Sequence, residues 1–228
     1  MSDFKNELKN FAFNKGADLV GVASKERFEG APKEHKPEDI LSKAKSVVVC
    51  AKKIPEGILN GIPTSYQKTM DTVHFQLDLL AYEIAVFLEQ KGGIAIPVPS
   101  DDPYWDWDPE NIRGRGDLSH RHAAQAAGLG RLGKNSLLIS PKFGNRVHLV
   151  SIVTNFDLMP DPLIEEDLCP ESCFLCIKAC LAKAIEEGPR INQKKCRAVM
   201  FQKIVSGTTE AMIEKCWECR KVCRVGIK

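Results

Sequence analysis

Up to about Asp157, the spacing of apolar residues predicts alternating helices and strands. Between residues 64 and 92, apolar side chains recur every three or four positions, which places them on one face of a helix that ends at a pair of glycines. A similar spacing predicts an N-terminal helix over residues 4–15. Shorter helices are expected in KPEDILSKAK and over residues 119–127.

Segments rich in β-branched residues predict the strands. They are DLVGVA, SVVVCAK, GIAIPVP, NSLLIS and NRVHLVSIVT. Strands that alternate with helices are typical of an α/β or α+β sheet domain. The acidic, proline-containing segment MPDPLIEED marks the expected boundary between a domain at residues 1–160 and a second at residues 161–228. In the second domain, the sequence predicts short helical pieces between cysteines.

Composition narrows the functional classes. The 228 residues include 32 basic and 30 acidic side chains, a formal charge of +2, which gives no large field of one sign to attract nucleic acid or anionic lipid. The chain has no secretory signal at its start and no apolar run near the ~20 residues that span a bilayer. We therefore expect a cytoplasmic protein with no membrane partner. In that reducing compartment, cysteines serve as metal ligands or redox groups more often than as disulfides.

Eight of the nine cysteines fall in the second domain, spaced C-x3-C-x2-C-x3-C, then one alone, then C-x2-C-x3-C. In a two-cluster ferredoxin run, three neighbouring cysteines hold one four-iron cluster and the fourth serves the other cluster. This rule assigns Cys169, Cys173, Cys176 and Cys223 to a first cluster, and Cys180, Cys196, Cys216 and Cys219 to a second. The ninth, Cys50, lies in a β-branched run and is expected in the core.

Two departures from the ferredoxin pattern leave an alternative open. The first gap is three residues instead of two, and no proline follows Cys180 or Cys223. Two structural zinc sites would need the same eight thiolates in tetrahedral arrangement. The dense cysteine run enters an apparent helix, CFLCIKACLAKAI, whereas zinc ribbons favour paired C-x2-C knuckles on hairpins. We favour the clusters.

The segment GLGRLG at residues 128–133 matches the dinucleotide pattern G-x-G-x-x-G. That pattern binds a pyrophosphate only where it follows a strand and opens a helix. Here a helical segment precedes it and a strand follows, so we reject the dinucleotide interpretation. The neighbouring GKNS also lacks the spacing of a P-loop.

Residues 123–161, AAQAAGLGRLGKNSLLISPKFGNRVHLVSIVTNFDLMPD, and the cysteine order after them resemble the superfamily of epoxyqueuosine reductases and cobalamin-dependent reductive dehalogenases. A weaker likeness in YQKTMDTVHFQLDLLAYEIAVFLEQKGGIAIPVP extends the resemblance over most of the chain. It implies an α+β fold in which a nitroreductase-like α/β domain binds cobalamin. A ferredoxin-like domain with two [4Fe-4S] clusters then delivers electrons to the cobalt from an external low-potential donor.

The resemblance also implies that the glycine loop approaches the corrinoid, where missing side chains permit close backbone contact. The expected cofactor-binding residues are Gly128, Leu129, Gly130, Gly133, Lys134, Asn135 and Ser136. The alternative is a tight connection between a helix and a strand that needs glycine for its own geometry.

Two features depart from the resemblance. Epoxyqueuosine reductases carry a V-D-x-x-P element whose aspartate is the proposed proton donor, but this region reads ENIRGRGDLSHRHAAQ. The nearest acid is Asp117, which either supplies a proton or caps the helix that starts near Ser119, and we favour the cap. Long members continue into helical repeats that help to hold transfer RNA, whereas this chain stops five residues after Cys223. On that ground we expect a small-molecule substrate and no nucleic-acid partner.

His120 and Tyr104 are further candidate catalytic residues. His120 and His122 lie two positions apart on a predicted helix and cannot share one face, so either would act alone, as a proton donor near neutral pH or as a hydrogen bond to a loop. Tyr104 lies in DDPYWDWDPE, whose aromatic residues suit a lid over a flat cofactor or a loop packed into the core. Tyr66 is expected to be a buried helix residue.

These observations predict an iron-sulfur oxidoreductase that passes electrons through two [4Fe-4S] clusters to bound cobalamin. The reaction expected is a reduction of a small molecule, similar to that of epoxyqueuosine reductases. The alternative is a ferredoxin-type electron-transfer module that docks to a partner enzyme and holds no organic cofactor. A zinc-stabilised interaction protein is the third possibility.

Overall fold

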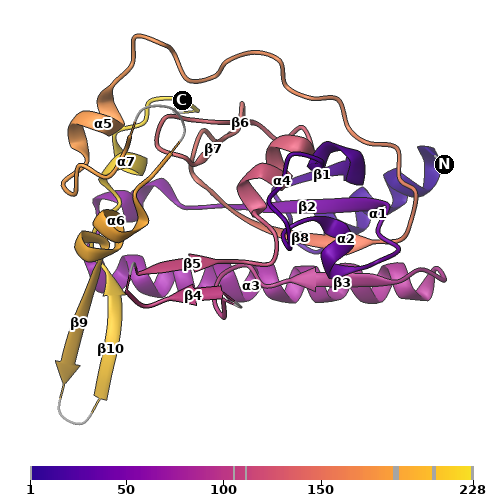
Figure 1. The fold of residues 1–228 in the computed structure, drawn as a ribbon, viewed down its shortest axis with the longest axis horizontal. Coiled ribbons are helices and arrows are strands. Elements are labelled where there is room, and N and C mark those ends of the chain that lie inside the picture. The colour runs from indigo at the N-terminus through magenta and orange to yellow at the C-terminus, as the bar shows by residue number, and fades with distance from the viewer. Residues whose placement is uncertain (1, 105, 111, 187–189, 207–208, 227–228) are drawn as a thin grey trace.

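A four-stranded antiparallel sheet in the order β1-β2-β8-β3 forms the centre of the protein (Figure 1). The structure is a computed structural model and describes residues 2–104, 106–110, 112–186, 190–206 and 209–226. The strands of this sheet are β1 (Leu19–Ser24), β2 (Ser46–Lys53), β3 (Ala95–Val98) and β8 (Val147–Thr154). Four of the predicted strands are therefore confirmed, and the fully antiparallel order makes the domain α+β.

The two central strands are buried on both faces. Because side chains of a strand point alternately to opposite faces, Val48 and Cys50 face the layer of α1 (Ser2–Asn14) and α3 (Pro63–Gln90). Val47 and Val49 face the opposite layer, which contains α4 (His120–Ala126). This two-sided burial explains the nearly unbroken apolar runs of β2 and β8, and it confirms Cys50 as a core thiol, fully buried, with a pKa that burial raises to about 12.

Helix α3 confirms the strongest periodic signal in the sequence. It begins with Pro63, whose missing N–H leaves no hydrogen bond unmade in the first turn, and the chain turns away at Gly92, whose φ is +87°. Its buried residues are Tyr66, Met70, Val73, Leu77, Leu80, Ala81, Ile84, Ala85 and Leu88. Within the described ranges, no helix is both long and apolar enough to cross a membrane.

Shorter elements surround the sheet. The predicted strand NSLLIS is reduced to β7 (Leu138–Ile139), which pairs with β6 (Arg131–Leu132) outside the central sheet. The loop after β3 contains a second small hairpin, β4 (Asp106–Asp108) with β5 (Arg113–Arg115). The remaining short helices are η1 (Lys25–Phe28), α2 (Pro37–Ile40) and η2 (Glu56–Asn60).

A segment without helix or strand links the sheet to the cysteine region and crosses the outside of the domain (Figure 1). Asp161 anchors it, because its carboxylate accepts a hydrogen bond from the Val22 N–H at 2.9 Å and lies 2.6 Å from Lys9 Nζ and 3.1 Å from Lys5 Nζ. The cysteine region then contains α5 (Leu175–Ala179), α6 (Gln193–Met200) and α7 (Glu218–Lys221). The domain division at residue 160 stays a prediction.

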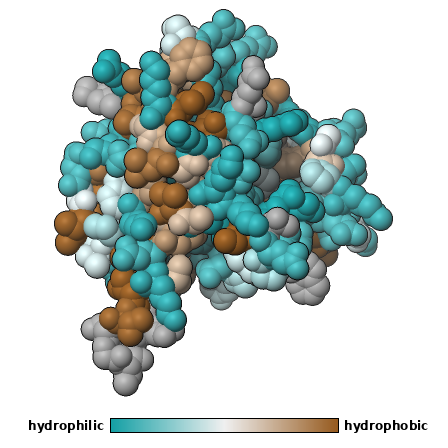
Figure 2. Space-filling view, turned by 60° about the vertical axis from the view of Figure 1, so that its left-hand side comes forward, coloured by the Kyte–Doolittle hydropathy of each residue, from teal (hydrophilic) through white to brown (hydrophobic). Residues whose placement is uncertain are grey.

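The prediction of helical pieces alone after residue 161 is wrong. Strands β9 (Phe201–Ser206) and β10 (Thr209–Glu214) form an antiparallel hairpin that projects from the body of the protein (Figures 1 and 2). Val205 and Met212 on these strands are 62% and 56% exposed. The segments FQKIVS and TEAMIE, on either side of a glycine, carry a strand pattern. The prediction for this region rested on the cysteine spacing alone and did not include it.

Trp217 fastens the cysteine region to the sheet domain. Its ring stacks on that of Tyr66, with centroids 4.0 Å apart and planes inclined by 7°, and its Nε1–H donates to the Leu59 carbonyl at 2.8 Å. Tyr66 is 3% exposed, so its predicted burial is confirmed. One side chain thus joins α3, the segment around η2 and the start of α7.

We predict that Trp217→Phe lowers the free energy of unfolding by about 1–3 kcal/mol, because phenylalanine keeps the stacking surface but leaves the buried Leu59 carbonyl without its donor. Urea denaturation followed by circular dichroism measures the loss. Trp107→Phe is the matched control, since Trp107 is 45% exposed, and it should leave the unfolding midpoint unchanged. Equal stability of the Trp217→Phe variant and the original protein would contradict this role.

Candidate functional site

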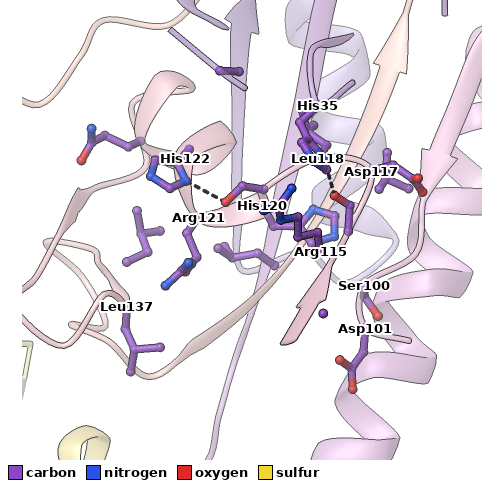
Figure 3. A pocket seen from close by; sticks show the side chains of 18 of the residues that line it. His35, Ser100, Asp101, Arg115, Asp117, Leu118, His120, Arg121, His122 and Leu137 are labelled. Carbon is purple, nitrogen blue, oxygen red and sulfur yellow. Dashed lines mark hydrogen bonds between the residues drawn. The ribbon is translucent and has the colours of Figure 1, made fainter. Parts of the chain in front are cut away.

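A cavity of about 1120 Å³ lies between the sheet domain and the cysteine region. Its wall includes the end of β3 and the loop after it, strand β5, the start of α4, the first residues of β8, and helix α6. Figure 3 shows His120, Arg121 and His122 of α4 on one side of the space and Ser100 and Asp101 of the loop after β3 nearby. The volume exceeds the roughly 300–1,000 Å³ usual for pockets that take drug-sized ligands.

The three predicted catalytic residues, Tyr104, Asp117 and His120, all line this cavity. They come from three separate segments that the fold brings to one wall. The N-cap of α4 is Ser119, not Asp117, and the Ser119 side chain makes no capping hydrogen bond. The preferred capping role of Asp117 is therefore not observed, and its role as a proton donor stays a prediction.

His120 is held by two hydrogen bonds within the protein. Its Nε2 lies 2.7 Å from the Pro99 carbonyl and its Nδ1 lies 2.8 Å from Ser151 Oγ. A carbonyl only accepts, so Nε2 carries the hydrogen and Nδ1 accepts from the serine hydroxyl. Burial lowers the pKa of His120. The ring is thus neutral and holds the loop in place, which is the alternative role expected for this histidine. His122 Nδ1 lies 2.7 Å from Ser119 Oγ.

Tyr104 is clamped between an acid and a base. Its hydroxyl donates to Asp101 Oδ1 at 3.0 Å and accepts from the Arg197 guanidinium at 3.3 Å. That guanidinium also lies over the rings of Tyr104 and Trp107, at 5.3 and 5.1 Å from their centroids. Burial, and then the Asp101 carboxylate, raise the pKa of Tyr104, so the phenol stays protonated. The aromatic loop is therefore fastened to α6; Trp105 lies outside the described residues.

Sequence reasoning missed two histidines beside this cavity. His74 of α3 places Nδ1 3.2 Å from Asp101 Oδ2, and its Nε2 lies 2.7 Å from Nδ1 of His148 on β8. Asp101 and His148 line the cavity. The three residues are far apart in the sequence, so only the antiparallel pairing of β3 with β8 and the packing of α3 on the sheet bring them together.

The glycine loop mainly satisfies the geometry of its own backbone. Gly128, with φ +72°, ends α4 in a Schellman turn, in which its N–H donates to Gln125 O and the Leu129 N–H donates to Ala124 O. A methyl group at Gly128 would collide with Pro162 O, and one at Gly130 with Ile139 O. Helix α4 precedes this motif, strand β6 lies within it and strand β7 follows it, so no helix opens at the glycines and the rejection of a dinucleotide site is confirmed.

The other residues of this loop contact neighbouring parts of the same chain. Leu129 belongs to the core, and a methyl group at Gly133 would crowd the Ile139 side chain. The Ser136 carbonyl accepts from Arg121 at 2.6 Å. Among the loop residues, Arg131 borders the large cavity. Cofactor binding by the loop stays a prediction, and the tight-connection alternative accounts for its glycines.

Lys134 and Asn135 bind the cysteine region directly. The Lys134 amine donates to the carbonyls of Pro170, Glu171 and Cys173 at 2.8, 2.6 and 2.9 Å. The Asn135 side-chain amide donates to the Cys219 carbonyl at 3.1 Å. Both residues also line a second cavity of about 510 Å³ together with Cys169, Cys173, Cys176 and Cys223.

The eight cysteines gather in two groups. Burial and the nearby thiols of Cys169, Cys173 and Cys223 raise the pKa of Cys176, so these four form the first group. Burial raises the pKa of Cys219 to about 12 despite Arg220, and the neighbouring thiols that add to the rise belong to Cys180, Cys196 and Cys216. The two groups have the same members as the two predicted cluster sets. Cys196 of the second group lines the large cavity.

Buried polar groups surround the two groups of cysteines. Within the described residues, no three His, Cys, Asp or Glu side chains stand close enough to hold one metal ion. A cube of four irons separates its thiolates more widely, because each binds a different iron. The buried side chain of Asn145 leaves both polar atoms without a partner in the described part of the chain, while its own carbonyl accepts from Arg220, the residue after Cys219.

Comparison with known proteins agrees with this geometry. The chain is 41% identical over 87 residues to an epoxyqueuosine reductase of Bacillus anthracis, covering 38% of this chain and 22% of the relative. It is 38% identical over 119 residues to a tetrachloroethene reductive dehalogenase of Dehalobacter restrictus, covering 50% and 19%. The fold matches that of the epoxyqueuosine reductase from Streptococcus thermophilus with a TM-score of 0.69, at 18% identity, over 98% of this chain and 66% of that one.

The predicted resemblance to the superfamily of epoxyqueuosine reductases and reductive dehalogenases is thus supported by sequence relatives of both kinds and by the shared fold. No family profile matches it. It spans less than two thirds of the length of the relatives that it matches. The sequence motifs that suggested the resemblance, the cysteine order and the segment around the glycine loop, are thus supported by homology.

The expectation of no nucleic-acid partner is wrong for this superfamily. An epoxyqueuosine reductase with a TM-score of 0.66 and 22% identity, of which this chain covers 65%, has been solved with an epoxyqueuosine-modified tRNA-Tyr stem loop. The expectation rested on a near-zero net charge and on where this chain ends. Net charge says nothing about a local surface, because screening confines the field of a charge to roughly 10 Å.

We predict that Lys134→Met speeds amide hydrogen exchange in residues 169–175 about tenfold, because three carbonyls of that loop lose their donor and local opening becomes easier by about 1.4 kcal/mol. Mass spectrometry of peptides from the purified protein measures the rate. Lys142→Met is the matched control, since the Lys142 amine lies over the Phe143 ring at 4.9 Å and away from that loop. Unchanged exchange in the Lys134 variant would refute the clamp.

Proposed function

We propose that this protein is a reductase in which two [4Fe-4S] clusters feed electrons to a corrinoid held in the large cavity. One observation carries the proposal: Cys196, a member of the second cysteine group, lines the same cavity as Tyr104, His120 and His148. A redox centre on that group would therefore lie next to any ligand in the cavity. The superfamily supports a reductase in general terms.

The grouping of thiols supports the order of electron flow. The first group lines the smaller cavity, and the second group borders the larger one. Cys180 follows α5, which carries Cys176 of the first group, so the two groups meet across this short helix. Electrons from an external low-potential donor would enter at the first group and leave through the second.

Basic and amide groups at the junction would balance the charge of two clusters. Arg146, 3% exposed, donates to the carbonyls of Cys223 and Val225 at 2.7 and 3.1 Å. Arg220, 8% exposed, donates to the carbonyls of Asn145 and Val147. Cations and hydrogen bonds near the sulfurs raise the potential of an iron-sulfur centre. The unpartnered Asn145 amide is a suitable donor to such a centre.

Two features of the cavity support a corrinoid as its ligand: its volume of about 1120 Å³ and the polar groups in its wall. A bound corrinoid would supply a strongly reducing metal centre, while the protein supplies orientation, exclusion of water and protons. Gln125 and Arg131 lie on the α4 side of the cavity, and Arg113 and Arg115 lie on the opposite hairpin. These polar groups would meet the amide side chains of the corrin ring. Contact with the glycine loop would come through Arg131.

The substrate is best sought among those named for the relatives. Epoxyqueuosine in a tRNA stem loop and tetrachloroethene are both reduced by members of the superfamily. Both reactions consume an electron pair; replacing a C–Cl bond by C–H takes one proton, and removing an epoxide oxygen as water takes two. A reductase with the cavity described here would act on one of these classes, and the protein would work in the cytoplasm.

We predict that anaerobic reconstitution with iron and sulfide gives about eight irons per chain and a visible absorption that dithionite bleaches. Hydroxocobalamin added to this protein should change its spectrum at a stoichiometry of about one. Iron binding without any cobalamin response would favour the electron-transfer module. A colourless, zinc-containing protein would refute the clusters.

Paired variants test the thiol assignment. Cys169→Ser with Cys223→Ser removes two ligands from one proposed cluster, so about four irons should remain. Cys169→Ser with Cys180→Ser removes one ligand from each, so neither cluster should form. The reverse result would mean that Cys180 shares a centre with Cys169. Cys50→Ala is the control and should keep all the iron, because Cys50 lies in the core.

Turnover of the two candidate substrates then decides the substrate class. Reduced, cobalamin-loaded protein is incubated with an epoxyqueuosine-containing RNA stem loop or with tetrachloroethene, and products are measured by mass spectrometry. Formation of queuosine or of a less chlorinated ethene identifies the class. Protein with the Cys180 and Cys169 substitutions is the control and should be inactive with both.

A further inference from the structure

A chain of hydrogen-bonded side chains runs along the wall of the large cavity. Tyr104 donates to Asp101 Oδ1 at 3.0 Å, Asp101 Oδ2 lies 3.2 Å from His74 Nδ1, and His74 Nε2 lies 2.7 Å from His148 Nδ1. The two imidazole rings meet edge to face, with planes at 61° and centroids 4.6 Å apart. Tyr104, Asp101 and His148 line the cavity, and His74 connects them from behind.

The partners fix where the hydrogens lie. A carboxylate only accepts, so Nδ1 of His74 carries a hydrogen. Burial opposes a charge on His74, but Asp101, helped by Glu214 and Asp78, outweighs it and raises the pKa of this histidine. His74 is thus the residue that holds a second proton, on Nε2, and donates it to Nδ1 of His148.

His148 is a partly buried histidine of the cavity wall. Burial, and then the charges of Arg220 and His74, lower its pKa well below the usual value, so the ring is neutral. With Nδ1 accepting from His74, its one hydrogen must be on Nε2. That Nε2 is buried and has no hydrogen-bond partner among the described residues. A buried donor left unpaired is unfavourable, and a ligand acceptor at this position would satisfy it.

Two of the other candidate donors, His120 and Tyr104, have no such hydrogen available. Both ring nitrogens of His120 are used by Pro99 and Ser151. The Tyr104 hydroxyl already donates to Asp101. In this arrangement Tyr104 and Asp101 are positioning residues, because they hold the charge on His74 and do not present a hydrogen to the cavity.

We propose that His148 donates its Nε2 proton to the ligand reduced in this cavity and that His74 replaces it. The inference rests on the proposed function, whose clusters provide the electron pair. The Nε2–H bond of His148 breaks as the ligand atom that gains electron density, carbon in a chloroethene or oxygen in an epoxide, forms its new bond to hydrogen; an epoxide oxygen that leaves as water takes its second proton from solvent. The Nε2–H bond of His74 breaks in turn, and its proton binds Nδ1 of His148. One proton is delivered, and His74 changes from imidazolium to imidazole.

The cycle closes with one proton from water. When the product leaves, water protonates Nε2 of His148, and the proton on Nδ1 returns to His74 beside Asp101. The charge that each delivery removes from His74 is thereby restored. The delivery step works only while His74 is charged, so its rate is full at low pH and declines as pH rises through the pKa of His74.

Histidine protonation states test the proposal without any substrate. The chain has five histidines, so nitrogen-15 spectra of labelled, reconstituted and oxidised protein can be assigned with single substitutions. We expect a doubly protonated His74 at pH 6 and a neutral His148 with hydrogen on Nε2. Asp101→Asn should lower the midpoint of His74 by about one pH unit or more. Asp106→Asn, on the same loop but paired with Arg115, should leave it unchanged.

Two variants of His148 separate proton delivery from hydrogen bonding. His148→Gln keeps an N–H donor at the ε position but cannot pass a proton on, and His148→Phe keeps neither. Both variants should bind hydroxocobalamin with the same spectral change as the original protein. Both should reduce whichever candidate substrate the original protein accepts at least tenfold more slowly. Asp101→Asn should shift the decline of the rate to lower pH, together with the His74 midpoint.

Several results would overturn the relay. The first is a His148 ring with its hydrogen on Nδ1, and the second is a His74 ring that is neutral at pH 6. The third is full activity in His148→Gln, which would mean that His148 acts only as a hydrogen-bond donor. Failure of the original protein to bind cobalamin would overturn the proposed function instead. The protonation states of the two histidines decide the relay on their own, since they are measured without cobalamin or substrate.

Discussion

The arrangement of this protein depends on cations that donate to backbone carbonyls where the cysteine region meets the sheet. An irregular segment has few backbone partners of its own, and buried carbonyls without donors are costly. Lys134 and Arg146 reach from the sheet domain to carbonyls around Cys173 and Cys223, and Arg220 reaches back to Asn145 and Val147. Hydrogen bonds donated in both directions thus fix the cysteine groups against the sheet domain, which forms part of the cavity wall.

This junction places a thiol group and a hydrogen-bonded chain on one cavity. Cys196 comes from α6, while His148 comes from a central strand that cannot shift without exposing both faces of the sheet. Arg197, the next residue after Cys196, contacts the Tyr104 hydroxyl that holds Asp101. A change at the second cysteine group therefore has a direct structural route to the proton-bearing side of the cavity.

The sequence predicted those parts of the fold that have a strong local signal. The helix of residues 63–90 and the strands around Val48 and Val150 follow from periodicity, and the cysteine spacing anticipated the two groups. The sequence did not reveal the hairpin of β9 and β10 after α6, because the prediction for that region was based on its cysteine spacing. Nor could it reveal the pairing of His74 with His148, because neither belongs to a motif and only tertiary packing joins them.

Each group of thiols draws members from both ends of the segment between Cys169 and Cys223. A ribosome makes these ends in order, so Cys169, Cys173 and Cys176 emerge long before Cys223 is attached. Neither group is whole until its late cysteines, Cys219 and Cys223, have left the exit tunnel. Any centre that requires a full group must therefore be installed after this whole segment has emerged, and the waiting thiols need protection from oxidation until then.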